Sequence, residues 1–359
     1  MTQNNFELEL LISLLKIYSP SGDAGKALNF LAEMLGKAGI DVNIDDYGVL
    51  TCTGEKPIVL LCGHVDTVPG QLPVTLRNGI LSGRGVVDAK GPLAAMICAF
   101  LRLQEEVREM VYFAVVSDEE TPEGLGTEAL LERLPRSIKY GIIGEPSRGR
   151  GVTVSYHGRL SFWLEVRGKA MHASASIARS NAIESCFQLY SSIKSRLLQS
   201  LGRIPICPTV VHGGDNLSSL PESCRLHVDL RVPPRFSLQE IKRIILDKVD
   251  RFRAEEKSFK VDIVFNSSVE PFSVKQDSIL VKTFLESIKE VMKVEPILIN
   301  KLGTSDFNLI GRRLGIPVVA YGPGNPRLSH TNIERLLVSE YLSSIDVLER
   351  VVKSLVEVC

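Results

Sequence analysis

Histidines and carboxylates stand at the ends of several apolar segments of this sequence. Carboxylates that lie close together repel one another, and burial increases the cost. A bound cation resolves this conflict, and imidazole with carboxylate ligands suits zinc, and also cobalt or manganese. The side chains that could form such a site are His64, Asp66, Asp88, Glu119, Glu120, Glu145 and His330.

With a pair of metal ions bound, these residues could catalyse hydrolysis. Two divalent ions ~3.5–4 Å apart can activate a bridging water and polarise a carbonyl. One acid must then remain free of metal to carry the proton. The neighbours Glu119 and Glu120 can supply a base and a ligand from one loop.

Short, fully apolar runs predict the strands that position these residues, because strands buried on both faces of a sheet have this pattern. Strands alternating with helices indicate an α/β domain, with a mixed, largely parallel sheet and helices on both faces. Ligands gather beyond the carboxyl ends of such strands, so the reactive residues are expected at one edge. The predicted strands are 58–62, 111–117 and 140–145, and the predicted helices 6–17, 24–38 and 93–101.

The middle of the chain has a different pattern. Residues 159–168 alternate like a half-exposed strand, and Ser237 with Glu240 predicts the start of a helix. The order there is strand, helix, strand, strand, helix, strand, which is that of a ferredoxin-like α+β module. We therefore expect a catalytic domain at 1–152 and 268–359, interrupted by an inserted module at 153–267.

Charge and composition exclude some classes of protein. Lys+Arg and Asp+Glu both number 42, so the chain lacks the basic excess of a nucleic-acid or membrane-surface protein. Its apolar runs are too short to span a membrane, and its N-terminal stretch has no basic leader. Seven cysteines without a CxxC pair favour a reducing, cytoplasmic compartment.

Five segments together resemble the serial motifs of the aminoacylase and carboxypeptidase G family of metallopeptidases. They occur in the order of that family and cover nearly the whole chain, whereas each alone would be weak. His64 alone would be a packing residue at a strand end, and Glu119 alone a solvated acid at a helix start. The segments are HVDTVPG, GRGVVDAKGPLAAM, SDEETPEGLGTEAL, GEPS and SHTNIE.

The resemblance implies a role for each reactive residue. Asp66 would orient His64, as the outer partners of metal-bound imidazoles do. Glu119 would take a proton from the bridging water and pass it to the leaving nitrogen. The implied ligands are His64 and Glu145 for one ion, Glu120 and His330 for the other, and Asp88 for both.

The inserted module also resembles that of the family, whose members use it as a lid and to form homodimers. GKAMHASA (168–175) resembles the segment whose histidine reaches a neighbouring active site, so His172 would steady the oxyanion. Asn216 and Arg231 match substrate-contacting residues, although Arg231 could equally be an ordinary ion-pair residue. Gly322, in Gly322-Pro323-Gly324, matches a backbone loop that lines the substrate pocket.

Within the family, DAKGPLA most resembles hydrolases that release lysine or ornithine from the C-terminal glutamate of an amino-group carrier protein, in lysine and arginine biosynthesis. Such carriers are acidic, and basic residues crowd the junction into the module. We expect this basic strip to dock the carrier, although an ordinary charged surface is the simpler interpretation. The strip consists of Arg148, Arg150, Arg159, Arg167 and Lys169.

Three other functions stay open. Small-molecule deacylases that act on acetylornithine or succinyl-diaminopimelate differ by a few residues at the same motif. A dipeptidase or aminopeptidase of the same family is a further alternative. A metal-bound scaffold protein is the non-enzyme alternative, but such proteins usually lose a ligand or the base. Zinc and cobalt suit the same ligands, so the metal used in the cell also stays open.

Overall fold

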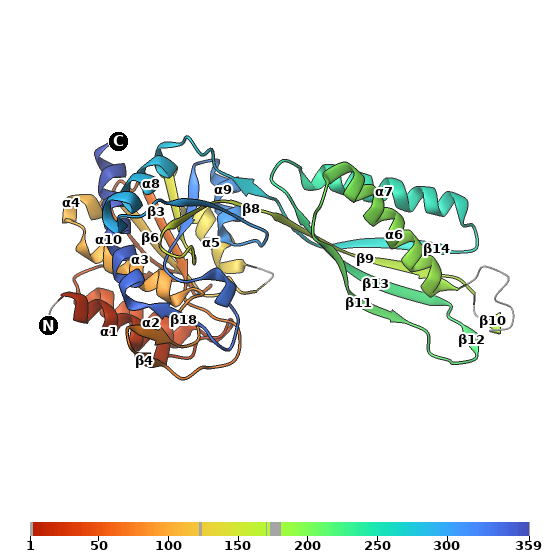
Figure 1. Cartoon of the computed structure of the whole chain (residues 1–359), viewed down its shortest axis with the longest axis horizontal. Helices are drawn as coiled ribbons and strands as arrows, with labels where there is room; N and C mark the ends of the chain where they lie inside the picture. The colour runs from red at the N-terminus through yellow and green to blue at the C-terminus, as the bar shows by residue number, and fades with distance from the viewer. Residues whose placement is uncertain (1–2, 122–123, 170, 173–180, 359) are drawn as a thin grey trace. The chain divides into compact units, whose positions relative to one another are not determined.

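The chain folds into two compact units. The computed structural model describes residues 3–121, 124–169, 171–172 and 181–358 (Figure 1). The first unit comprises Met1–Ser155, Ser273–Lys301 and Ser305–Cys359, and the second comprises Tyr156–Phe272 with Leu302–Thr304. In the sequence, the second unit therefore interrupts the first.

A nine-stranded mixed sheet forms the centre of the first unit, in the order β1-β2-β6-β3-β7-β17-β8-β15 with β16 paired to β8. Its four central strands, β6, β3, β7 and β17, run parallel, and β2 and β8 flank them antiparallel. This confirms the predicted mixed sheet. The strands are β1 (Asn43–Ile44), β2 (Leu50–Thr53), β3 (Val59–His64), β6 (Val111–Val116), β7 (Tyr140–Gly144), β8 (Gly151–Tyr156), β15 (Phe272–Ser273), β16 (Ile297–Lys301) and β17 (Val318–Tyr321).

Helices cover this sheet. The helix that follows Asp88 is buried almost throughout, and its Lys90 side chain is buried as well. Lys90 Nζ donates hydrogen bonds to the carbonyls of Leu14 and Ile17. These bonds attach the C-terminal end of the first helix to the helix that carries Lys90. The helices are α1 (Gln3–Lys16), α2 (Gly25–Lys37), α3 (Lys90–Arg102), α4 (Glu105–Arg108), α5 (Leu125–Arg133), α8 (Ile279–Met292), α9 (Asp306–Leu314), α10 (Val338–Glu357) and the 3-10 helix η2 (Pro326–Leu328).

A small antiparallel sheet joins two distant parts of the first unit. It has the order β18-β5-β4, with β4 (Thr75–Arg77), β5 (Ile80–Ser82) and β18 (Arg335–Leu337). Strand β5 leads into residues 83–88, which we name the Asp88 loop. Strand β18 follows residues 329–334, the His330 loop. Pairing of β5 with β18 therefore holds the two loops side by side.

The second unit is a four-stranded antiparallel sheet, in the order β11-β13-β9-β14, with two helices on one face (Figure 1). Alternate residues of β9 point into the core beneath the helices, as the alternating pattern predicts. A capping box between Ser237 and Glu240 starts α7. The elements are β9 (Gly158–Arg167), β10 (Met171–His172), α6 (Ala182–Leu201), β11 (Ile206–Gly213), β12 (Ser219–Leu220), β13 (Ser223–Val232), α7 (Leu238–Glu255) and β14 (Lys260–Val269).

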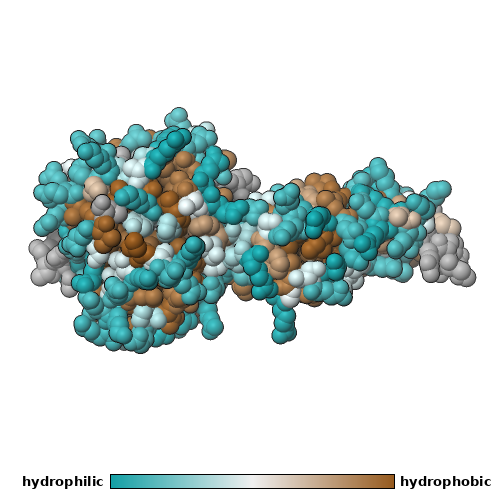
Figure 2. All heavy atoms as spheres, turned by 90° about the horizontal axis from the view of Figure 1, so that it is seen from above, coloured by the Kyte–Doolittle hydropathy of each residue, from teal (hydrophilic) through white to brown (hydrophobic). Residues whose placement is uncertain are grey.

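The helical layer of the second unit carries apolar atoms among hydrophilic ones on its outer surface (Figure 2). Among the exposed apolar side chains of this unit are Phe187 and Leu198 on α6 and Leu246 on α7. Within the described ranges, none of the helices combines the length and the apolar character needed to cross a membrane. The six described cysteines are all free thiols.

Candidate metal centre

Three parallel strands deliver the reactive residues to one edge of the main sheet. His64 is the last residue of β3, and it pairs in register with Val116 at the end of β6. Asp118, Glu119 and Glu120 follow β6 after one residue, Ser117, and Glu145 follows the last residue of β7. The carboxyl ends of parallel strands therefore bring these side chains together, as the sequence predicts.

Asp88 lies between two imidazoles. Its Oδ1 is 3.6 Å from His64 Nε2, and its Oδ2 is 3.3 Å from His330 Nε2. His330 Nε2 is also 2.8 Å from Glu120 Oε1. Burial would raise the pKa of Asp88, but its contacts with His330 and His64 lower it instead. One carboxylate thus faces both histidines that the resemblance assigns to separate ions.

Two overlapping groups of side chains have the spacing of a metal site. One is His64, Asp88 and Glu120, and the other is His64, Glu119 and Glu145. Within each group, the candidate ligand atoms lie within 4.8 Å of one another. Glu119, the predicted proton carrier, therefore stands as close to His64 as a ligand would. Geometry alone does not separate the base from the ligand in the Glu119-Glu120 pair.

The state of His64 fits a metal ligand. Its Nδ1 lies 3.0 Å from the Asp66 carbonyl oxygen and 3.4 Å from Asp66 Oδ1. Its Nε2 is buried and has no hydrogen-bond partner in the described part of the chain. Fixing one ring nitrogen and directing the other at carboxylates is the arrangement of metal-binding histidines. The imidazole and carboxylate donors suit a divalent ion such as zinc or cobalt.

Asp66 links the His64 strand end to the loop that carries Glu119 and Glu120. Its carboxylate accepts hydrogen bonds from the Ser21 hydroxyl at 2.6 Å and from the Glu119 and Glu120 amides at 3.2 and 3.1 Å. Burial would raise the pKa of Asp66, but the His64 ring, the Ser21 hydroxyl and the Glu120 amide lower it. Asp66 therefore stays ionised, and it positions the Glu119-Glu120 backbone as well as the His64 ring.

Glu119 has the electrostatic environment of a proton carrier. Burial raises the pKa of its carboxyl group well above the ordinary value, and the negative charges of Glu145, Asp306 and Glu120 raise it further. The nearby His64 acts in the opposite direction. A carboxyl group that takes up a proton readily suits general acid and base chemistry.

A buried ion pair joins the Asp88 loop to the His330 loop. Arg84 Nη1 donates to Glu334 Oε1 at 2.6 Å and to the Thr331 carbonyl at 2.9 Å. The other oxygen of Glu334 accepts from the Gly85 and Val87 amides at 3.0 and 3.2 Å. Both side chains are buried. The pair therefore fixes the separation of the two loops that carry Asp88 and His330.

Glu334→Gln is expected to lower the free energy of unfolding by about 3–5 kcal/mol, because it leaves the Arg84 guanidinium buried without a counter-charge. Urea unfolding of the metal-free protein measures this. Glu290→Gln is the matched control, because Glu290 pairs with Arg350 at an exposed position and should cost about 1 kcal/mol or less. Equal effects of the two changes would contradict the structural role of the buried pair.

Gly322 packs behind the loop that carries Glu145. A Cβ atom at Gly322 would lie 2.6 Å from Pro92 Cβ and 2.9 Å from the Glu145 carbonyl oxygen. The Gly322 carbonyl accepts from the Ser147 and Gly149 amides at 3.0 Å each. Glycine is therefore required here, because Pro92 and the Glu145 carbonyl leave no room for a side chain. Its carbonyl also fixes the backbone that follows Glu145. The predicted contact of Gly322 with substrate stays a prediction.

The structure adds two residues that the sequence did not single out. Lys301, at the end of β16, places Nζ 2.9 Å from Glu145 Oε2. Asp306 is buried and accepts from Thr127 Oγ1 at 2.6 Å, and burial raises its pKa to about 7. Both flank the polar loop between β16 and α9, where Ser305 caps the helix. That polar loop is the only local feature of the sequence that could have indicated a role in the site for Lys301 or Asp306.

The remaining predicted site residues belong to the second unit. His172 is exposed on the short strand β10, and residues 170 and 173–180 of its segment lie outside the described part of the chain. Asn216 is exposed, and its side-chain oxygen accepts from the Ser218 amide at 2.8 Å. Arg231 Nε lies 2.9 Å from Asp229 Oδ1. The substrate roles of these residues stay predictions.

The predicted basic strip is less compact than the sequence suggested. Arg159 pairs with Asp229, and Arg167 pairs with Glu165. The two arginines stand near opposite ends of β9, about 26 Å apart at about 3.3 Å per residue. They therefore do not belong to one small patch, and each has an acidic neighbour that offsets its charge.

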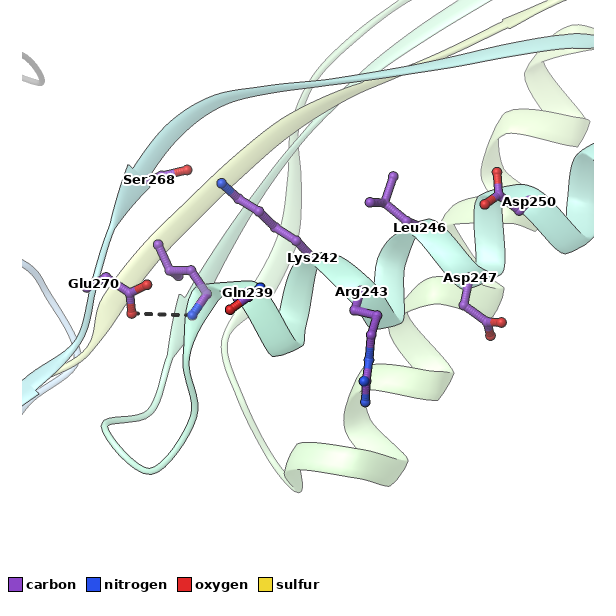
Figure 3. Close-up of a pocket in the computed structure, with 9 residues that line it drawn as sticks. Gln239, Lys242, Arg243, Leu246, Asp247, Asp250, Ser268 and Glu270 are labelled. Carbon is purple, nitrogen blue, oxygen red and sulfur yellow. Dashed lines mark hydrogen bonds between the residues drawn. The ribbon is translucent and has the colours of Figure 1, made fainter.

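A separate pocket lies along α7 and the end of β14 in the second unit (Figure 3). The Leu238 amide donates to Glu270 Oε2 at 3.3 Å at one end of it. Its lining mixes charges of both signs and includes no histidine or cysteine, so it does not resemble the metal centre. The lining residues are Leu238, Gln239, Lys242, Arg243, Leu246, Asp247, Asp250, Ser268 and Glu270.

Metal binding is expected to release protons at neutral pH. Hydrogen bonds to Asp88 and Glu120 raise the pKa of His330 to about 10, so the ring is protonated in the metal-free protein at pH 7. A metal ligand must be deprotonated, so metal affinity should rise by up to about tenfold per pH unit between pH 7 and 10 for this proton. Calorimetry in buffers of different ionisation enthalpy measures the release, and binding heats that did not depend on the buffer would contradict it.

Comparison with known proteins yields one family. The model of Peptidase family M20/M25/M40 matches residues 60–354. A LysW-lysine/LysW-ornithine hydrolase of Sulfurisphaera tokodaii is 33% identical over 335 residues, which cover 92% of this chain and 90% of the relative. A Pyrococcus abyssi protein that carries the same name provisionally is 36% identical over 353 residues, covering 97% of this chain and 94% of the relative.

Solved structures show the same fold at lower sequence identity. A tripeptidase from Staphylococcus aureus superposes with a TM-score of 0.84 at 21% identity, covering 99% of each chain. An M20 family metallo-carboxypeptidase from Sulfolobus solfataricus superposes with a TM-score of 0.77 at 20% identity, covering 97% of this chain and 98% of the other. These matches confirm the fold.

Proposed function

The chain belongs to peptidase family M20/M25/M40, and from this premise we propose that it is a metal-dependent amide hydrolase that releases lysine or ornithine from the C-terminal glutamate of an acidic amino-group carrier protein. The single observation that supports the substrate most directly is the similarity over nearly the full chain to LysW-lysine/LysW-ornithine hydrolases. The proposal places the enzyme in lysine or arginine biosynthesis, in the cytoplasm.

We propose that the cluster at the sheet edge holds two divalent ions, with zinc or cobalt as the best candidates for its donors. His64 and Glu145 would hold one ion, Glu120 and His330 the other, and Asp88 both. Bound there, the ions would supply Lewis-acid polarisation of the scissile carbonyl and lower the pKa of water.

The chain's own residues would then move the proton. Glu119, whose pKa burial raises, takes a proton from the attacking water and gives it to the leaving nitrogen. Asp66 keeps the imidazole of His64 in one orientation and fixes the backbone of Glu119 through its amide. The amide bond breaks when the protonated amine leaves.

We propose that the second unit completes the site and forms a homodimer. His172 would steady the oxyanion, and Asn216 and Arg231 would contact the substrate, with Gly322 lining the pocket. Strand β11 is at the edge of its four-stranded sheet and exposes Val210 and Val211. An exposed edge strand with apolar side chains is a template for pairing with another chain, which supports the dimer. Analytical ultracentrifugation of the full chain tests it.

The test of the proposed substrate offers several amides side by side to the zinc- or cobalt-loaded protein. They are LysW-linked lysine and ornithine, acetylornithine and succinyl-diaminopimelate, and release of the free amino acid is measured for each. A strong preference for the carrier-linked forms supports the proposal. Preference for a free acyl amino acid would overturn the carrier substrate and make the protein a small-molecule deacylase.

Salt dependence tests the docking surface. The KM for a carrier-linked substrate should rise with ionic strength, because screening weakens attraction between the acidic carrier and exposed arginines such as Arg150. The KM for a small acyl amino acid should change much less, which makes it the matched control. If both KM values respond equally, the basic strip is not a docking surface.

A further inference from the structure

The small sheet β18-β5-β4 exposes apolar side chains on its outer face (Figure 1). Its inner face is part of the core, because Leu81 and Leu336 pair in register and are both buried. One position along, Ile80 pairs with Leu337 on one side and with Arg77 on the other. These three side chains therefore share the opposite face. Ile80 is 38% exposed and Leu337 50%, so two large apolar side chains stand together in contact with solvent.

Two arginines flank this apolar pair. Arg77 is on β4, and Arg335 is on β18 two positions before Leu337, so both belong to the same face. They are about 12 Å apart, at about 4.8 Å between strands and about 3.3 Å per residue. We name Arg77, Ile80, Arg335 and Leu337 the small-sheet face.

The charge of the small-sheet face is not balanced locally. Both arginines are exposed, and within the described part of the chain neither forms an ion pair. The surrounding segments 68–87 and 329–339 contain a single acid, Glu334. That acid is buried and already paired with Arg84. The face therefore attracts anions.

The small-sheet face lies close to the metal cluster. Ser82, at the end of β5, is six positions before Asp88, and Arg335 is five positions after His330. An extended chain covers at most about 3.6 Å per residue, so each strand end lies within about 20 Å of one of these two candidate ligands. A macromolecule that docked on this face could therefore place a chain end in the metal cluster.

The chemistry of the face selects the kind of partner. Exposed cations beside an apolar pair fit an acidic polypeptide that also offers apolar side chains. An anionic membrane is a poorer fit, because lipid-binding clusters usually have about 4–8 basic residues. A second copy of this chain fits poorly as well, because a two-fold contact would place these arginines against their own counterparts.

We propose that the small-sheet face docks the acidic carrier protein and holds it while its C-terminal amide enters the metal cluster. This inference rests on the proposed function, to which it adds a docking surface in the first unit. The face is separate from the basic strip, whose Arg159 and Arg167 are offset by acidic neighbours.

The test reverses the charge of the face and compares two substrates. Wild type and the double variant Arg77→Glu/Arg335→Glu, both metal-loaded, are offered LysW-linked lysine and a short peptide of the carrier's last few residues that bears the same lysine. The KM for the full carrier should rise roughly tenfold, since exposed ion pairs are each worth up to a few-fold and reversal adds repulsion. The KM for the peptide, which does not reach the face, and both turnover numbers should stay as in wild type.

Two control variants separate the face from general effects. Arg312→Glu/Arg313→Glu makes the same change at exposed arginines in the last turn of α9, and should leave both KM values unchanged. Ile80→Thr/Leu337→Thr removes the apolar pair but keeps residues that favour strands. It should raise the KM for the full carrier a few-fold and leave the salt dependence of that KM intact. Thermal unfolding checks that each variant is folded.

The outcomes distinguish this proposal from the proposed function. If wild type cleaves LysW-linked lysine and Arg77→Glu/Arg335→Glu does so with the same KM, the docking surface is wrong and the proposed function stands. The docking surface is also wrong if the KM for the peptide rises as much as that for the full carrier. If wild type cleaves only small acyl amino acids, the proposed function fails and the docking proposal fails with it.

The other occupants are tested with the same double variant. Sedimentation velocity reports contact between copies, and flotation with phosphatidylserine vesicles reports lipid binding. Both measurements should be the same for wild type and variant. A change of oligomeric state, or vesicle binding that the variant loses, would assign the face to a second copy or to a membrane and overturn the proposal.

Discussion

Glu119→Gln is expected to lower the turnover number by about 10²–10⁴-fold, the usual contribution of a positioned general acid or base. Glutamine keeps the size of the side chain but cannot take up the proton that Glu119 is placed to carry. Because the proposed ligands are unchanged, the metal content should stay near that of wild type. Steady-state kinetics and elemental analysis of the same preparation measure both quantities.

Glu120→Gln is the matched control, since it makes the same chemical change one residue along the same loop. Glu120 Oε1 lies 2.8 Å from His330 Nε2, so this change removes a proposed ligand rather than the base. It should lower metal content first and activity as a consequence. The opposite pattern, with metal lost from Glu119→Gln and retained by Glu120→Gln, would exchange the roles of the two acids.

The sequence was sufficient to predict the strands that carry the site. The apolar runs at 58–62, 111–117 and 140–145 correspond to β3, β6 and β7 within two residues at each end. The reason is physical, because strands buried on both faces must be apolar throughout, and parallel strands leave their carboxyl ends at one edge. The convergence of His64, the Glu119-Glu120 pair and Glu145 follows from that rule alone.

Long-range pairings were not predictable in the same way. Arg84 and Glu334 both stand in recognised motifs, but no local pattern shows that side chains 250 positions apart form one buried ion pair. Lys301 is a single lysine before a polar loop, and nothing in the sequence distinguishes it from an ordinary exposed lysine. The spread of the basic strip has a similar cause, because an extended strand places Arg159 and Arg167 far apart although they are near in sequence.

The pairings that the sequence did not show explain how the cluster keeps its geometry. The loops that carry the candidate ligands are held in place by contacts to distant parts of the chain. Asp66 fixes the Glu119-Glu120 segment, and the Arg84–Glu334 pair fixes the loops of Asp88 and His330. His330 itself has a left-handed backbone, with φ of 62°, a conformation that costs energy and persists only where the surroundings enforce it.

Asp88→Asn is expected to have the largest effect on metal binding, because Asp88 is the only carboxylate among the described residues that offers an oxygen to both His64 and His330. Asparagine keeps the shape but replaces one oxygen by an amide nitrogen, which donates hydrogen bonds and does not bind metal. The loss of affinity for at least one ion should exceed the about 10–100-fold that loss of an outer hydrogen-bond partner costs. Activity should fall with it, and chelator competition measures the affinity.

Asp118→Asn provides the control for this experiment. Asp118 precedes Glu119 directly, but its carboxylate accepts from the Gly126 amide at 3.0 and 3.1 Å and is not among the candidate ligands. Asparagine can still accept that hydrogen bond, so metal affinity should stay close to that of wild type. If Asp88→Asn retained both ions as tightly as Asp118→Asn does, Asp88 would not bridge them, and its position between the histidines would serve only to neutralise their charge.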